Sequence, residues 1–260
     1  MTLEERIEKI KDLRPIDDVF FEVLAEDKEV CQEILQTIME DDKLIVTDVI
    51  VQSSKRNLYG RSVRLDALCT LGNGILCNIE VQRSNNDDHL RRARYNASVI
   101  TSKETEIGEK FENIPEIYII YISEFDFLKE CKTIYHIEKI IKETGTLVDD
   151  GVHEIFVNTS IDDGTKISEL MRCMTQKEVN DTNFPNLVKR VKFLKTSEGG
   201  TRTMCEVMEK YMAEAANEAS IEANIKAVIN MLRLKIDENE IKKLYPSEFE
   251  EGKRRFLEKN

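Results

Sequence analysis

The chain has 260 residues and a formal net charge of −12, with 41% hydrophobic and 34% charged residues. This composition is typical of a soluble globular protein with a sizeable core, and it argues against extensive disorder. The negative charge argues against broad coating of nucleic acid, because such binding depends on Lys and Arg side chains that neutralise phosphates. Any binding of nucleic acid must therefore be local.

The sequence also argues against a membrane or secreted setting. No stretch approaches the roughly 18 uncharged apolar residues that a membrane span requires, and the start, MTLEERIEKIKDL, lacks the apolar core of a signal peptide. The six cysteines show no C-x-x-C spacing, and the three histidines lie far apart. We therefore expect a cytoplasmic protein with no membrane partner and no zinc site or disulfide framework.

The first predicted elements are two helices. Apolar residues at helical spacing predict a helix over residues 3–13, which ends before Pro15. A second helix is capped by Asp17 or Asp18, and its apolar face extends as far as Ile38. Segments rich in β-branched residues then predict three successive strands, at residues 44–52, 62–71 and 75–82.

The next elements alternate before the chain becomes helical. Asp87 or Asp88 caps a predicted helix that runs to about Ser102, residues 117–122 form a buried strand, and residues 133–140 and 153–157 form a hairpin. After about residue 158 the pattern is helical, at 166–174, 187–194, 201–234 and 238–245. We therefore expect one domain over residues 1–160 and a helical region over 161–260. Its alanine-rich segment, 213–227, suits a long helix that pairs with a second copy, which predicts a homo-oligomer.

The hairpin formed by residues 62–71 and 75–82 has the strongest chemical signal. If Gly72, Asn73 and Gly74 form a three-residue loop, opposed residues have numbers that sum to 146. One face is then continuously apolar, and the other face places Asp66 opposite Glu80, with Gln82 two residues further on. A two-residue turn would mix apolar and polar residues on both faces, so burial favours the longer loop.

Two opposed carboxylates repel each other, and a bound cation would remove that cost. Magnesium is usually held by one or two carboxylates together with water and phosphate oxygens, so Asp66 and Glu80 form a candidate Mg²⁺ site, with Mn²⁺ as the alternative ion. Gln82 is placed to orient an attacking water or to bind a phosphate oxygen. In the alternative interpretation, Asp66 and Glu80 simply lie on a solvated face of the sheet.

At these residues the sequence resembles the PD-(D/E)XK nuclease superfamily, and more narrowly its recombination-promoting nuclease and transposase-like group. The motif residues are Arg64-Leu65-Asp66 and Ile79-Glu80-Val81-Gln82. Further matches are Asp17-Asp18-Val19-Phe20, Arg91-Arg92-Ala93-Arg94-Tyr95 and Ile117 to Phe127. The resemblance implies an α/β fold with a restriction-endonuclease-like core, in the order helix, three strands, helix, strand, and a helical C-terminal region. Residues 1–160 would then be the nuclease-like domain.

The resemblance also implies roles for individual residues. Asp66 and Glu80 would be metal ligands, and the carbonyl of Val81 would be a third ligand. Asp17 would be an additional acid, from the first helix of the family's core. Gln82 stands where the wider superfamily usually has lysine, whereas glutamine is normal in the narrower group. We further expect phosphate contacts from the helix that follows the motif, through Arg91, Arg92 and Arg94; in the alternative interpretation these arginines form a solvated or ion-paired helix face.

These features predict a magnesium-dependent DNA endonuclease linked to recombination or mobile elements. An alternative function is that of a nuclease-fold protein with little or no catalysis, which acts as an interaction module through its helical C-terminal region. RNA as the substrate also stays open, because both nucleic acids offer the same phosphate chemistry.

Overall fold

The computed structural model describes residues 2–55, 63–85 and 88–258. They form two compact units, residues 1–205 and residues 206–260, which are considered separately. Ser62, at the start of a predicted strand, and Asp87, one of two predicted helix caps, lie outside the described residues. Within the described ranges, no helix combines the length and apolar character needed to span a membrane.

The first unit is built on a mixed six-stranded sheet. Its strands, in spatial order, are β1 (Val46–Lys55), β2 (Val63–Leu71), β3 (Leu76–Gln82), β4 (Ile117–Ser123), β8 (Val152–Asn158) and β5 (Ile134–Ile137). β3, β4 and β8 are parallel to one another, whereas β1–β2, β2–β3 and β5–β8 are antiparallel pairs. β6 (Lys139–Ile141) and β7 (Thr146–Val148) form a separate two-stranded sheet.

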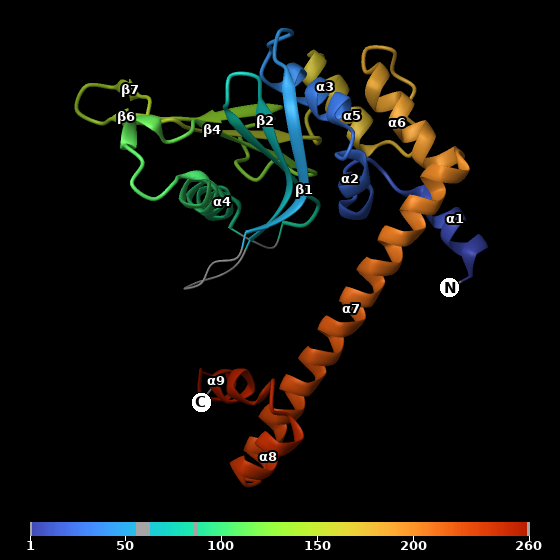
Figure 1. Ribbon diagram of the computed structural model, residues 1–260, viewed down its shortest axis with the longest axis vertical. Coiled ribbons are helices and arrows are strands. Elements are labelled where there is room, and N and C mark those ends of the chain that lie inside the picture. The colour runs from blue at the N-terminus through green and yellow to red at the C-terminus, as the bar shows by residue number, and fades with distance from the viewer. Residues whose placement is uncertain (1, 56–62, 86–87, 259–260) are drawn as a thin grey trace. The chain divides into compact units, whose positions relative to one another are not determined.

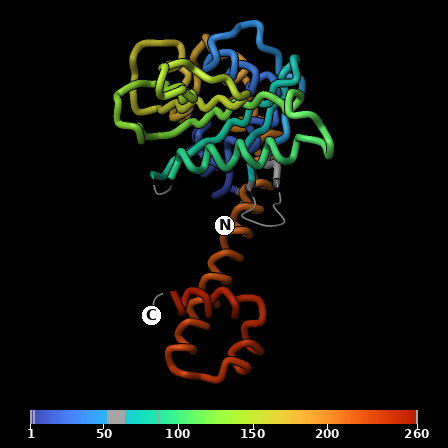
Figure 2. The backbone as a smooth tube through the Cα atoms, turned by 90° about the vertical axis from the view of Figure 1, so that its left-hand side faces the viewer, coloured from blue at the N-terminus to red at the C-terminus, as the bar shows by residue number. Residues whose placement is uncertain are grey.

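Helices cover both faces of the sheet (Figure 1). α4 (His89–Glu104) packs on one face, and α2 (Asp18–Leu24) and α3 (Lys28–Ile38) pack on the other. α5 (Lys166–Thr175) and α6 (Pro185–Thr196) lie against α3. The remaining helical segments of this unit are α1 (Leu3–Asp12), a short 3-10 turn (Phe111–Asn113) and the first part of α7 (Glu198–Arg233). In Figure 2, α4 crosses in front of the strands that it covers.

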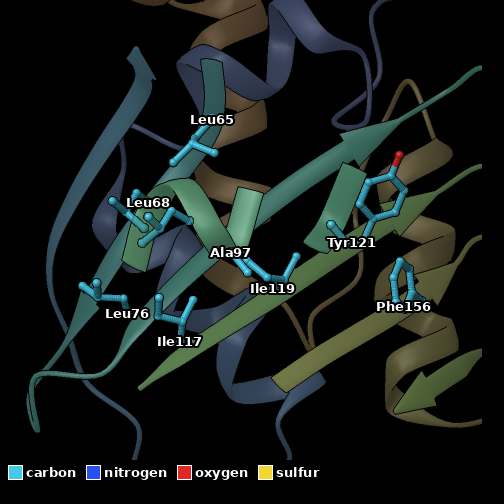
Figure 3. Packing of buried hydrophobic residues seen from close by; sticks show 10 residues of the cluster. Leu65, Leu68, Leu76, Ala97, Ile117, Ile119, Tyr121 and Phe156 are labelled. Atoms are coloured by element: carbon cyan, nitrogen blue, oxygen red, sulfur yellow. The ribbon is translucent and has the colours of Figure 1, made fainter. Parts of the chain in front are cut away.

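A buried apolar cluster fixes α4 on the sheet (Figure 3). Leu68, Leu76 and Ile119 of the sheet are at most 8% exposed and meet Ala97 and Ile100 of α4, which are at most 4% exposed. Burying a large aliphatic side chain contributes about 1.5–3 kcal/mol. The first turns of α4 are thereby held over the end of β3, where the candidate site lies.

The register predicted for the β2–β3 hairpin is confirmed over its paired length. Ala67 pairs with Ile79 and Thr70 with Leu76, so each pair sums to 146. The Leu71 N–H donates to the Ile75 carbonyl at 2.9 Å, which closes the three-residue loop. Gly74 has a φ of 85°, a left-handed conformation that glycine adopts without steric cost.

Two predicted elements differ from the structure, and one helix was not predicted. The second helix is interrupted after Leu24, because the side chain of Asp27 accepts from the Glu29 N–H and caps a separate helix, α3. The predicted strand 133–140 is divided between β5, which pairs with β8 as the hairpin predicted, and β6, which pairs with β7. A last helix, α9 (Phe249–Glu258), was not predicted.

Two side chains attach α6 to the first helices of the unit. The carboxylate of Glu33, on α3, accepts from the backbone N–H groups of Asn186 and Leu187 at 3.1 and 2.9 Å, which caps the start of α6. The ammonium of Lys195, on α6, donates to the carbonyls of Lys11 and Leu13 at 2.9 and 2.5 Å. α5 and α6 thus belong to the first compact unit; that residues 1–160 fold as a domain without them stays a prediction.

The second unit is helical. It contains the end of α7, α8 (Glu238–Leu244) and α9, which enclose the buried side chains of Val228, Ile241 and Phe249. Gly252 lies so close to α7 that an added Cβ would be 2.5 Å from a methyl carbon of Val228. Glycine is therefore required where α9 contacts α7.

Candidate active site

Asp66 and Glu80 meet where the backbone pairing of β2 with β3 ends, just beyond the pair Ala67–Ile79. Oδ2 of Asp66 accepts from the Val81 N–H at 2.9 Å, and Oε1 of Glu80 accepts from the Asp66 N–H at 3.2 Å. Each carboxylate thus bonds to the backbone of the opposite strand, in place of the ladder hydrogen bonds. The structure brings together the two acids that the register predicted to be opposed.

Glu80 is fully buried and Asp66 is partly buried. Burial raises the pKa of Asp66 well above its usual value, and the neighbouring charge of Glu80 raises it further. Burial also raises the pKa of Glu80, although Arg92 and the hydrogen bond from Asn78 act in the opposite direction. A fully buried Glu80 contradicts the alternative in which this pair lies on a solvated face.

Two further side chains contact Glu80. Asn78, two residues earlier on β3 and 0% exposed, donates from Nδ2 to Oε1 of Glu80 at 3.0 Å. Arg92, on α4, places Nη2 at 3.3 Å from Oε2 of Glu80. Asn78 was not predicted as a site residue, although the hairpin register already put it beside Glu80 on the same face.

Gln82 is held at the open end of β3. Its Oε1 accepts from Nη1 of Arg92 at 2.8 Å, and its Nε2 donates to the carbonyl and the hydroxyl of Ser84, both at 3.0 Å. Both polar ends of the amide therefore have partners. Arg92 connects Gln82 to Glu80 and belongs to the same cluster.

The three arginines predicted to bind phosphate face different surroundings. Arg92 contacts the acidic cluster, whereas Arg91 and Arg94 line a groove of about 930 Å³ beside α4. The opposite wall of that groove includes Ile137, Lys139 and Glu154, from β5, β6 and β8. The structure thus separates Arg92 from Arg91 and Arg94.

The two acids at the start of α2 are also separated. Asp17 is occupied by arginines: its Oδ1 lies 2.9 Å from Nη2 of Arg14 and 3.0 Å from Nη1 of Arg83. Asp18 is exposed, and its charge contributes, after burial and Glu80, to the raised pKa of Asp66. Asp18, which was not predicted as a site residue, therefore interacts electrostatically with the carboxylate pair.

Comparison with known proteins identifies the family of the chain. The model of the PD-(D/E)XK nuclease family transposases matches residues 15–243, which include the whole sheet, α4 and all of α7. The chain belongs to this family. The predicted resemblance to the PD-(D/E)XK family is thereby confirmed, as is the α/β nuclease-like fold with a helical C-terminal region. No curated protein and no solved structure matched the chain in two further searches.

Membership of the PD-(D/E)XK nuclease family transposases implies a nuclease that binds DNA, and such nucleases generally use divalent metal ions. In the ranges that the structure describes, no group of three or more His, Cys, Asp or Glu side chains is arranged to hold a metal. The site instead offers a pair of carboxylates, Asp66 and Glu80. Mg²⁺ is commonly bound by one or two carboxylates, with water and substrate phosphate completing its coordination. The donor set at this site therefore fits the ion that the family implies.

Proposed function

We propose that this protein is a metal-dependent endonuclease that hydrolyses phosphodiester bonds of DNA during recombination or the movement of mobile elements. The observation that supports this function best is the interlocked pair of Asp66 and Glu80, two carboxylates kept together at the end of a sheet despite their repulsion. A buried pair of like charges destabilises a fold unless a cation compensates it. Such pairs are therefore retained mainly at functional sites.

In this proposal Asp66 and Glu80 would hold Mg²⁺ or Mn²⁺, and the carbonyl of Val81 would be a third ligand. The bound ion would polarise the scissile phosphate, lower the pKa of the attacking water and neutralise charge on the leaving oxygen. Asn78 fixes the rotamer of Glu80 through its hydrogen bond to Oε1. Gln82, at the open end of the strand, would exchange its contacts with Ser84 for the attacking water or a phosphate oxygen.

The proposal includes local contacts to DNA, because the net charge of −12 disfavours an extended interface. Arg92 would bind phosphate beside the carboxylate pair, and Arg91 and Arg94 would bind it along the groove. Asp17 forms ion pairs with Arg14 and with Arg83, the residue after β3. These contacts would hold the end of β3 in place. In that arrangement Asp18, rather than Asp17, is the acid at the start of α2 that acts at the site.

A second candidate function is an interaction module with weak or no catalysis. The observation in its favour is the middle of α7, where residues 215–221 are all exposed, with Met212 and Ile221 49% and 40% exposed. The exposed surface of this helix leaves room for a partner helix. This candidate predicts self-association without cleavage.

Nicking of supercoiled plasmid in Mg²⁺ or Mn²⁺ tests the proposed function. The wild type should nick DNA, and Asp66→Asn and Glu80→Gln should each lower the rate by about 100-fold or more, because each removes a metal-binding charge. Glu112→Gln, an exposed acid outside the site, is the matched control and should nick like the wild type. The same assay on RNA distinguishes the two substrates. Full activity in both site variants would refute the proposal.

A further inference from the structure

Arg92 is a cationic side chain in direct contact with the carboxylate pair. Its guanidinium lies 3.3 Å from Oε2 of Glu80 and 2.8 Å from Oε1 of Gln82. The Arg92 side chain is 34% exposed, whereas that of Glu80 is 0% exposed. Arg92 is therefore the side of this ion pair that reaches solvent, and it can change partners without unfolding the site.

The oxygens of the two acids are divided between two kinds of contact. Oε1 of Glu80 accepts from Asn78 and from the Asp66 N–H, and Oδ2 of Asp66 accepts from the Val81 N–H. These bonds hold the carboxylates in place and leave Oε2 of Glu80 and Oδ1 of Asp66 outside them. Arg92 contacts Oε2, the Glu80 oxygen that these bonds leave for another partner.

We propose that Arg92 is a displaceable counter-cation, which neutralises Glu80 in the metal-free protein and moves to a phosphate oxygen of the nucleic acid when a divalent ion binds. The guanidinium suits both partners, because its planar array of N–H donors pairs with either a carboxylate or a phosphate. The exchange keeps the number of cations next to Glu80 constant. It also couples metal binding to capture of the substrate.

The rest of α4 provides a matched control. Arg91 and Arg94 carry the same charge on the same helix but line the groove instead of contacting Glu80. Competition for one carboxylate oxygen depends on contact, so it should be specific to Arg92. If the arginines instead acted by long-range repulsion of the divalent ion, substituting any of the three should change the metal affinity to a similar extent.

The first experiment measures Mg²⁺ binding by calorimetry on the full chain without nucleic acid. Arg92→Gln should bind Mg²⁺ roughly tenfold more tightly than the wild type, because it removes the competing cation. Arg92→Lys, which keeps the charge, and Arg94→Gln should each stay within about threefold of the wild type. Circular dichroism verifies that the variants are folded. Unchanged or weaker Mg²⁺ binding by Arg92→Gln would overturn the competition. So would Arg92→Lys binding Mg²⁺ as tightly as Arg92→Gln does.

The second experiment tests the transfer to phosphate and rests on the proposed function. With saturating Mg²⁺ and plasmid DNA, Arg92→Gln should cleave about 100-fold more slowly than the wild type even though it binds the metal more tightly. Arg92→Lys should be intermediate, because an ammonium offers charge without the bidentate geometry. Cleavage by Arg92→Gln at the wild-type rate would overturn the transfer.

The two experiments separate failure of this inference from failure of the proposed function. Tighter Mg²⁺ binding by Arg92→Gln, with no cleavage of any nucleic acid by the wild type, would support the counter-cation and refute the nuclease. Cleavage by the wild type, together with an unchanged Mg²⁺ affinity in Arg92→Gln, would support the nuclease and refute the counter-cation. Absence of Mg²⁺ binding in both proteins would refute both.

Discussion

At the scale of single residues, the site depends on side chains that bond to the backbone of the opposite strand. Asp66 and Glu80 each accept a backbone N–H across the hairpin, and Asn78 adds a third hydrogen bond. These bonds hold two carboxylates together that would otherwise separate. The raised pKa values of both acids are the electrostatic cost of that arrangement.

This cost predicts a particular dependence of stability on pH in the metal-free protein. A carboxyl group whose pKa is raised by folding binds more protons in the folded state, so its contribution to stability is present at acid pH and is lost as pH rises through the folded pKa. Asp66→Asn keeps the oxygen that accepts from Val81 and removes the charge. We therefore expect this variant to be more stable than the wild type by about 1–3 kcal/mol at pH 8.

Urea unfolding of the two proteins in chelator, from pH 4 to pH 8, measures this difference. The gap between the variant and the wild type should widen as pH rises, and saturating Mg²⁺ should reduce it by stabilising the wild type. A gap that does not change with pH would contradict a raised pKa for this pair.

The pairing of Asp66 with Glu80 was predictable from the sequence, because parity and burial together fix which residues oppose each other in a hairpin. The division of the arginines was implicit in helical spacing: residues 91 and 94 are three apart and share a face, whereas residue 92 is turned by about 100° from residue 91. The contact of Arg92 with Glu80 was not predictable, because it requires knowing how α4 docks on the sheet. The same holds for the ion pairs of Asp17.

At the scale of secondary-structure elements, the fold depends on how helix ends are satisfied. α6 begins at Pro185, and the N–H groups of Asn186 and Leu187 point to the carboxylate of Glu33 on α3. Glu33 is buried, and its cap connects two helices through residues that are 153 and 154 apart in sequence. Removing it leaves one buried and one partly buried N–H donor without their acceptor.

We therefore expect Glu33→Ala to lower the free energy of unfolding by about 1–3 kcal/mol. Urea denaturation at pH 7 measures the change, and Glu29→Ala, an exposed acid on the same helix, should shift the value by less than about 0.5 kcal/mol. Equal stabilities of the two variants would show that the cap does not hold α6.

Element types were largely predictable because apolar spacing is a local signal. Strands β1 to β4 and helix α4 follow from runs of β-branched residues or from apolar residues at helical spacing. The break between α2 and α3 was not predicted because the apolar face continues across it, and the cap at Asp27 resembles an ordinary acidic residue in sequence. α9 is dense in charge and was overlooked, since its contact with α7 involves a glycine.

At the scale of the whole molecule, the chain combines an α/β nuclease-like unit with a helical unit. The apolar side chains of Met212 and Ile221 are exposed on α7. If the C-terminal helices join two copies, as we propose, the wild type should be a dimer or larger in light scattering. Met212→Glu combined with Ile221→Glu should then shift the protein to a monomer, because the two residues lie on opposite faces of α7 and pairing through either face would bury a charge. A wild type that is monomeric at high concentration would contradict this proposal.

The most direct test of the central claim is to locate a divalent ion in crystals of the wild-type protein grown with Mn²⁺. Anomalous diffraction at the manganese edge should give a peak in contact with the carboxylates of Asp66 and Glu80, and Glu80→Gln crystals should lose it. A fully occupied manganese peak elsewhere, with none at these two acids, would contradict the assignment of Asp66 and Glu80 as the metal site.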